Sequence, residues 1–142
     1  PLNMVISTTG AAKAVAKALP ELKGLLTGNA IRVPTPNVSM AIMNLNLKKA
    51  TDKEALNDYL RHISFNSKLQ NQVDYTASTE IVSTDLVGSR YAGVVDSQAT
   101  IVDGDRAVLY VWYDNEFGYS CQVVRCLEKF AGVVWPSYPK KT

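Results

Sequence analysis

The sequence predicts an α+β domain, in which helices pack on one face of a mixed, largely antiparallel sheet. Segments with helical and strand patterns follow one another in the order helix, strand, helix, three strands, helix. Two of the predicted strands are joined by Asp103-Gly104-Asp105, a tight turn that favours antiparallel pairing. The regular β-α-β alternation and glycine-rich first turn of a doubly wound nucleotide fold do not occur in this sequence.

The first predicted helix covers residues 7–19, where a Ser/Thr/Thr/Gly lead-in supplies an N-cap for an alanine-rich run. Pro20 is expected to end this helix, because proline cannot continue the backbone hydrogen bonding. Residues 30–47 then have an extended pattern that Pro34 and Pro36 interrupt early, which indicates an irregular or edge strand.

The second predicted helix has the clearest signal in the chain. Residues 51–54, Thr-Asp-Lys-Glu, form a capping box. One helical face then carries Ala55, Leu56, Tyr59, Leu60 and Ile63. Three strands are predicted after this helix, over residues 80–87, 92–102 and 107–113.

The last predicted helix is capped by Asp114 or Asn115 and ends at Gly132. Its apolar residues are Phe117, Val123, Val124, Leu127 and Phe130.

The composition is that of a single soluble globular domain. The 142 residues are 46% hydrophobic and 20% charged, with a net charge of +2. That charge is too small to indicate a nucleic-acid or anionic-membrane partner. No apolar run approaches the roughly 20 residues of a membrane span, and the N-terminus does not have the pattern of a signal peptide. Because the chain does not begin with Met, we expect a fragment or a processed product.

The two cysteines, Cys121 and Cys126, lie five residues apart in the last predicted helix, where they point in different directions and are not expected to form a disulfide. Free thiols suit a reducing cytosol. With a single histidine and no Cys-x-x-Cys motif, no metal site is predicted.

Two segments are candidate anion sites. Ser7-Thr8-Thr9-Gly10 precedes a helix, whose free N–H groups and positive dipole end attract phosphate. Arg32, in a strand-like run, could grip a phosphate with two N–H bonds. The simpler interpretations are an ordinary N-cap and a strand arginine paired with a surface carboxylate.

A third candidate site is the run of aromatic and polar residues from Trp112 to Ser120, at a strand-to-helix junction. Asn115 could offer its amide to a ligand carboxamide, and Tyr119 could stack on a ligand or donate a hydrogen bond. The alternative is a capping asparagine among core aromatic residues. His62 is interpreted as a solvated helix residue, and the cysteines as small helix residues rather than nucleophiles.

Four segments resemble the family of phosphorylating glyceraldehyde-3-phosphate dehydrogenases, in that family's order and spacing and over nearly the whole chain. They read STTGAAKAVAKALPELKGLLTG, IRVPTPNVS, VSTDLVGSRYAGVVDSQATI and WYDNEFGYS. The resemblance implies the C-terminal catalytic domain of a cytoplasmic, homotetrameric glycolytic enzyme. Such an enzyme oxidises glyceraldehyde 3-phosphate with NAD and inorganic phosphate to 1,3-bisphosphoglycerate.

The resemblance also implies roles for five residues. It assigns Thr9 and Gly10 to the inorganic-phosphate site, Arg32 to the nearby phosphate of the substrate, Asn115 to the nicotinamide carboxamide, and Tyr119 to the lining of the nicotinamide pocket. NADP as the cofactor and erythrose 4-phosphate as the substrate are both left open.

Three parts of the family's enzyme have no match in this chain: the nucleophilic cysteine, the base histidine and the glycine-rich dinucleotide-binding domain. No catalytic residue is therefore assigned. The 142 residues alone are expected to be inactive. Ile42 stands where the family usually has an acidic residue, Phe117 replaces a commoner tyrosine, and the tail from residue 131 is longer than usual. The rival interpretation is a stand-alone binding or assembly module of the same fold.

Overall fold

The computed structural model describes residues 2–136, so the last six residues of the long tail lie outside it. The chain divides into two compact units, Pro1–Pro36 and Asn37–Thr142, which are described separately. A two-stranded sheet, a mixed but largely antiparallel five-stranded sheet and three α-helices confirm the predicted α+β class.

The first unit is a strand–helix–strand arrangement. Strand β1 (Val5–Thr8) pairs antiparallel with β2 (Asn29–Arg32), and between them lie α1 (Ala11–Ala18) and the 3₁₀ helix η1 (Pro20–Leu22). The helix therefore starts later than predicted, because the Val-Ile-Ser-Thr run has strand propensity and a partner in β2. Pro20 ends α1 as predicted.

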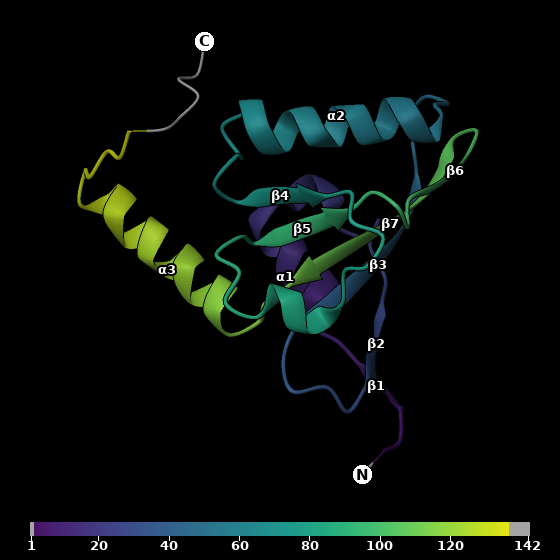
Figure 1. Cartoon of the computed structure of the whole chain (residues 1–142), viewed down its shortest axis with the longest axis horizontal. Helices are drawn as coiled ribbons and strands as arrows, with labels where there is room; N and C mark the ends of the chain where they lie inside the picture. The colour runs from purple at the N-terminus through teal and green to yellow at the C-terminus, as the bar shows by residue number, and fades with distance from the viewer. Residues whose placement is uncertain (1, 137–142) are drawn as a thin grey trace. The chain divides into compact units, whose positions relative to one another are not determined.

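The second unit is built on the sheet β3-β7-β5-β4 (Figure 1). Strands β3 (Ser39–Asn46) and β5 (Gly93–Asp96) both run antiparallel to β7 (Arg106–Tyr113), while β4 (Val73–Thr76) runs parallel to β5. Strand β6 (Ile101–Asp103) forms the predicted hairpin with β7, and Gly104 supplies the positive φ (63°) of its turn.

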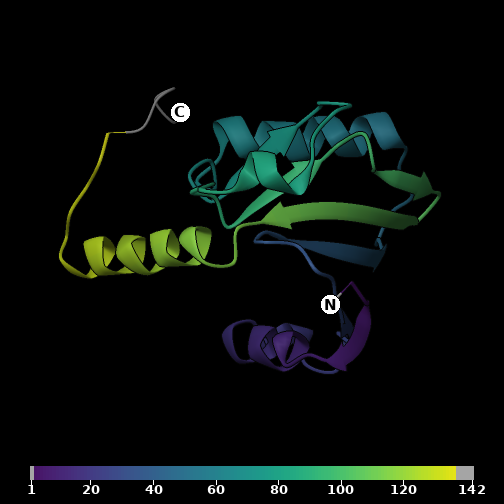
Figure 2. The same cartoon turned by 60° about the horizontal axis from the view of Figure 1, so that its bottom comes forward.

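The core lies between this sheet and helix α2 (Lys53–Asn66), which covers one face of the sheet (Figure 2). Val95, Ala107 and Leu109 are at most 6% exposed. Their register partners place them on the same face of the sheet. The Asn57 side-chain amide on α2 donates to the Ser97 carbonyl oxygen at 3.0 Å and ties the helix to the loop after β5.

Three predicted elements differ in the structure. The strand predicted over residues 80–87 is wrong, because Ser83–Leu86 is a 3₁₀ helix, η2, in which the Asp85 side chain accepts the Val82 N–H at 2.9 Å. The strand predicted over 92–102 is interrupted between β5 and β6 by a turn in which Ala99 N–H donates to Asp96 Oδ1 at 3.3 Å and Thr100 N–H donates to the Ser97 carbonyl at 3.4 Å. Strand β4 was not predicted.

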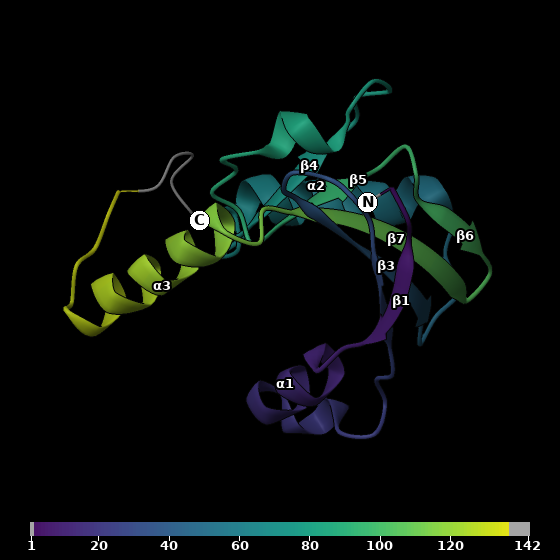
Figure 3. The same ribbon diagram turned by 90° about the horizontal axis from the view of Figure 1, so that it is seen from below.

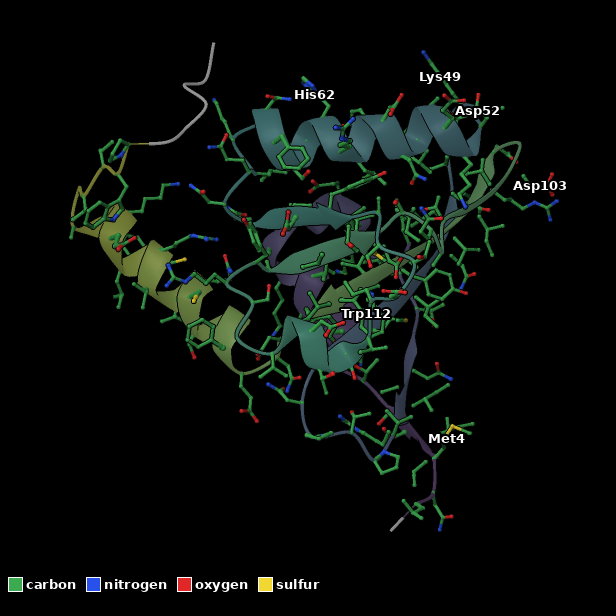
Figure 4. The ribbon with its side chains drawn as sticks, viewed as in Figure 1. Met4, Lys49, Asp52, His62, Asp103 and Trp112 are labelled. Carbon is green, nitrogen blue, oxygen red and sulfur yellow. The ribbon has the colours of Figure 1, made fainter. Side chains whose placement is uncertain are left out.

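The predicted capping box of α2 is displaced by one residue. Asp52, not Thr51, is the N-cap, and its Oδ1 accepts the Ala55 N–H at 2.8 Å. Figure 4 shows Asp52 at the start of α2. Aspartate competes well with threonine for this position.

Glu116 occupies the N-cap position of helix α3 (Phe117–Phe130) and supplies no side-chain cap. The side chain that caps the N–H groups leading into the helix is that of Asp114, not that of Asn115. Asp114 is 2% exposed. Oδ1 accepts the N–H groups of Glu116 at 2.9 Å and Phe117 at 2.8 Å, and Oδ2 accepts the N–H of Gly88 at 2.8 Å. These hydrogen bonds lower the pKa of Asp114 to about 2, and the bond from Gly88 has the largest effect. The Asn37 side chain lowers the pKa further, whereas burial of the carboxyl group raises it.

The other end of α3 has the predicted stop. Gly132 adopts a φ of 71°, its N–H donates to the Lys129 carbonyl, and Val133 N–H donates to Glu128 at 2.9 Å. The helix runs away from the sheet rather than across it (Figures 1 and 3). Its predicted apolar residues are consequently exposed by 43% or more in the described part of the chain.

Gly118, in the first turn of α3, lies against the loop that precedes β5. A Cβ atom there would stand 2.8 Å from the Tyr91 carbonyl oxygen and 3.3 Å from that of Ser89. Glycine is therefore required for the approach of these two backbones.

We expect the stability of the fold to fall as Asp114 is protonated. Its folded pKa of about 2 lies below its ordinary 3.8, so the stabilisation is complete above about pH 4 and is lost as the pH falls toward 2. Asp114→Asn, which leaves the backbone donors with a weaker acceptor, should cost about 1–3 kcal/mol at pH 7. Urea unfolding of both proteins between pH 6 and pH 2 should show this difference shrinking with acid; a constant difference would contradict the role of the carboxylate.

Gly118→Ala should destabilise the second unit by about 1–3 kcal/mol, because the new methyl group meets backbone carbonyls that cannot rotate away. Cys126→Ala is the matched control, since it places alanine at an exposed position of the same helix. Denaturant midpoints followed by the fluorescence of Trp112 would measure both. Equal midpoints for the two variants would show that the close approach is not needed.

Candidate functional site

The first candidate site lies where β1 leads into α1. Thr9 Oγ1 accepts the N–H of Ala11 at 3.2 Å, and Gly10 occupies the N-cap position with no side-chain cap of its own. Apart from its chain neighbours, no atom lies within 4 Å of where a Gly10 Cβ would stand, so there is open space on this side of the residue. With no acidic residue in the first turn, the positive end of α1 is not neutralised locally.

Arg32 lies in the same unit but not beside Thr9. It is the exposed last residue of β2, opposite Val5, whereas Thr9 follows Thr8, which pairs with Asn29. Arg32 thus stands at one end of the four-residue ladder and Thr9 just beyond the other end, about 13 Å apart along the strand direction. In the described part of the chain Arg32 makes no ion pair.

Ser7 was part of the predicted lead-in but lies within β1. Its hydroxyl oxygen is buried and has no hydrogen-bond partner in the structure. Buried polar atoms are rarely left unpaired. The orphaned hydroxyl is thus a second polar feature of the segment that ends at Thr9 and Gly10.

The second candidate site lies where β7 leads into α3. Because Asp114 caps the helix, Asn115 is not the capping residue, and its amide remains available. The Ser39 hydroxyl donates to Asn115 Oδ1 at 3.2 Å, and Asn115 is exposed. Tyr119 is 69% exposed, so it is not a core aromatic residue.

The segment that supports Asn115 is strained. Val38 has a φ of 72° although it is β-branched, and its side chain is only 7% exposed. Its neighbour Ser39 donates to Asn115, and the side chain of its other neighbour, Asn37, contributes to the lowered pKa of Asp114. Sequence reasoning missed both of these supporting residues, because nothing local to them indicates which residues they face across the sheet.

The remaining polar candidates are His62 and the two cysteines. His62 is exposed on α2, with its Nδ1 3.4 Å from the Asn66 amide nitrogen (Figure 4). Cys121 and Cys126 are both free. Among residues 2–136, no group of three or more His, Cys, Asp or Glu side chains could hold a metal ion, and no helix is long and apolar enough to span a membrane.

Residues 1–115 match the family model described as "Glyceraldehyde 3-phosphate dehydrogenase, C-terminal domain". The chain is 69% identical over 140 residues to a "Glyceraldehyde-3-phosphate dehydrogenase-like protein" of Pseudomonas aeruginosa, covering 99% of this chain and 30% of that protein. It is 43% identical over 127 residues to the glyceraldehyde-3-phosphate dehydrogenase of Chlamydia trachomatis serovar D, covering 89% of this chain and 37% of that enzyme. The chain thus spans about a third of the length of these curated relatives.

The family model covers most of the chain, including the Thr9-Gly10 turn, Arg32 and Asn115. The relatives align across both units. The chain therefore belongs to the glyceraldehyde-3-phosphate dehydrogenase family, and corresponds to its C-terminal domain.

Proposed function

We propose that this chain is the phosphate- and nicotinamide-contacting part of a phosphorylating glyceraldehyde-3-phosphate dehydrogenase. The complete enzyme would be a cytoplasmic homotetramer that converts glyceraldehyde 3-phosphate and inorganic phosphate to 1,3-bisphosphoglycerate in glycolysis. One observation beyond family membership carries the proposal: Asp114 caps α3, which leaves the exposed Asn115 amide free for a ligand while Ser39 orients it.

The Asn115 side chain fits the nicotinamide end of NAD by its donor set. A carboxamide offers one acceptor and two donors, which complement the same groups on the nicotinamide carboxamide. Ser39 engages the oxygen of Asn115 and so fixes the rotation of the amide. When bound, the nicotinamide ring accepts hydride; the part of Asn115 is to hold one face of that ring toward the substrate, with Tyr119 lining the pocket. The same contacts suit NADP.

The two anion sites fit the two phosphate groups of the product. Arg32 presents a planar guanidinium that can donate two parallel hydrogen bonds to the phosphate of the substrate. Thr9 and Gly10 offer inorganic phosphate the open N-terminus of α1. Because the substrate's phosphate and its reacting aldehyde lie at opposite ends of a three-carbon chain, two separated anion sites suit it better than one.

Arg32→Ala and Asn115→Ala, made in the complete enzyme, should each weaken the binding of a different ligand. Arg32→Ala removes a charged partner of the substrate and should lower kcat/KM for glyceraldehyde 3-phosphate about 10- to 100-fold, with NAD affinity unchanged. Asn115→Ala should weaken NAD binding and leave the KM for the aldehyde nearly unchanged. Steady-state kinetics and calorimetric NAD titration would separate the two effects, and equal losses of both ligands in either variant would contradict the assignment.

The 142-residue chain alone should form no NADH from the aldehyde, because neither the family's cysteine nucleophile nor its base has a match in this sequence. A full-length glyceraldehyde-3-phosphate dehydrogenase, assayed under the same conditions, is the positive control. Thiol-dependent NADH formation by the purified chain would overturn this prediction. The rival binding module would be favoured if an antibody against this domain captured from cells only a species near 15.5 kDa.

A further inference from the structure

The start of α3 and the loop before β5 border an open surface cavity of about 330 Å³ that none of the roles above uses. Its lining residues are Arg90, Phe117, Ser120, Cys121, Val124 and Arg125. The five from α3 fall at intervals of three and four, so they share one helical face. Tyr119 lies two residues from Phe117 and hence points away from that face, which separates the cavity from the proposed nicotinamide site.

The cavity is positively charged. It is lined by two guanidinium groups and by no carboxylate. Within residues 2–136 the only ion pair is Arg106–Asp103, so neither Arg90 nor Arg125 is neutralised by a partner. The pKa of the neighbouring Tyr91 is raised, chiefly by burial and also by the charge of Asp74. The charge of Arg125 acts in the opposite direction and lowers that pKa, so both charged residues lie near Tyr91. The charge of Arg125 is thus directed toward the loop that carries Arg90.

Gln122 holds the two arginine-bearing segments together. Its side-chain amide nitrogen donates to the Arg90 carbonyl oxygen at 3.0 Å and to that of Gly118 at 3.1 Å. Its amide oxygen accepts from Arg125 Nη1 at 2.8 Å. The loop and the helix are therefore fixed before any ligand arrives, which lowers the entropic cost of binding.

The remaining lining combines apolar surface with small polar groups. Phe117 is 46% exposed and Val124 is 52% exposed, so an apolar group entering the cavity would cover surface that water now covers. Ser120 adds a hydroxyl group, although it already donates to the Glu116 carbonyl at 2.9 Å. Two guanidinium groups that line the same cavity beside an apolar wall match a carboxylate that carries an aromatic or aliphatic portion.

We propose that this cavity binds a small organic carboxylate, whose anionic group lies between Arg90 and Arg125 and whose apolar portion packs on Phe117 and Val124. This proposal does not depend on the dehydrogenase assignment, since it uses none of the residues given roles in that reaction.

Cys121 lines the cavity, whereas Cys126 is an exposed thiol five residues further along the same helix and does not line it. The rate at which Cys121 reacts thus reports on the cavity, and the rate at which Cys126 reacts is the control.

The probe is 5,5′-dithiobis(2-nitrobenzoate), an anionic aromatic disulfide. The cysteine thiolate attacks one sulfur, a mixed disulfide forms, the S–S bond of the probe breaks, and nitrothiobenzoate leaves with the electron pair. The uncharged 4,4′-dithiodipyridine reacts by the same exchange.

The experiment compares the full chain carrying Cys121→Ser with the full chain carrying Cys126→Ser. On accessibility alone, Cys126 would react faster with both probes. We expect the ratio of the Cys121 rate to the Cys126 rate to be about tenfold higher with the anionic probe than with the neutral one at low salt, and to fall in 1 M salt. Benzoate should slow the reaction of Cys121 and not that of Cys126.

Arg90→Gln and Arg125→Gln, each made in the Cys126→Ser background, should remove most of the tenfold preference while circular dichroism remains unchanged. Equal ratios for the two probes would overturn the proposal. So would protection of both thiols by benzoate. Protection of Cys121 by inorganic phosphate but not by benzoate would overturn the assigned class of ligand, because it would show an anion site without an apolar component.

Discussion

The second unit depends on one buried carboxylate. The two oxygens of Asp114 accept three backbone N–H groups, two from the start of α3 and one from Gly88 in the loop before β5. A buried carboxylate is costly unless it is fully hydrogen-bonded, and hydrogen bonds to a charged acceptor are about twice as strong as neutral ones. The side chain therefore defines the end of β7, the beginning of α3 and the position of a loop 26 residues away along the chain. Gly118 completes the junction, because only glycine lets the helix approach the carbonyl groups of that loop so closely.

The cap has a consequence for the neighbouring residue. Aspartate and asparagine are nearly equal as N-caps, and if Asn115 were the cap its amide would be committed to the backbone. With Asp114 in that position, Asn115 is exposed and is held only by the Ser39 hydroxyl. Ser39 in turn follows Val38, whose positive φ is a conformation that costs on the order of 1–3 kcal/mol. The burial of Val38 and the bond from Ser39 to Asn115 help to maintain this conformation. The strained residue, the Asp114 cap and the exposed amide of Asn115 therefore lie in one connected arrangement.

The elements that could be predicted from the sequence are those whose signals are local. Helix α2, the Asp-Gly hairpin and the glycine stop of α3 each follow from a few adjacent residues. Strand β4 could not be found in this way, because its four residues form a strand only by pairing in parallel with β5, which lies about 20 residues further on. Residues 80–87 have the apolar content of a strand, but the Asp85 side chain offers Val82 a local hydrogen bond that closes a 3₁₀ turn instead. At the candidate site, the residue types were evident, whereas the choice between Asp114 and Asn115 depended on burial.

The separation of Thr9 and Arg32 along the β1–β2 ladder follows from pairing and could not be inferred from two residues 23 positions apart in sequence. It also restricts what the first unit can bind. Two cationic or N–H-rich positions side by side would favour one multiply charged anion, held by both. Placed about 13 Å apart on a short antiparallel ladder, they favour two anions, or one molecule with an anionic group at each end. The β1–β2 pairing fixes that spacing through backbone hydrogen bonds, so side-chain changes at Thr9 or Arg32 would alter the affinity of one position and leave its distance from the other unchanged.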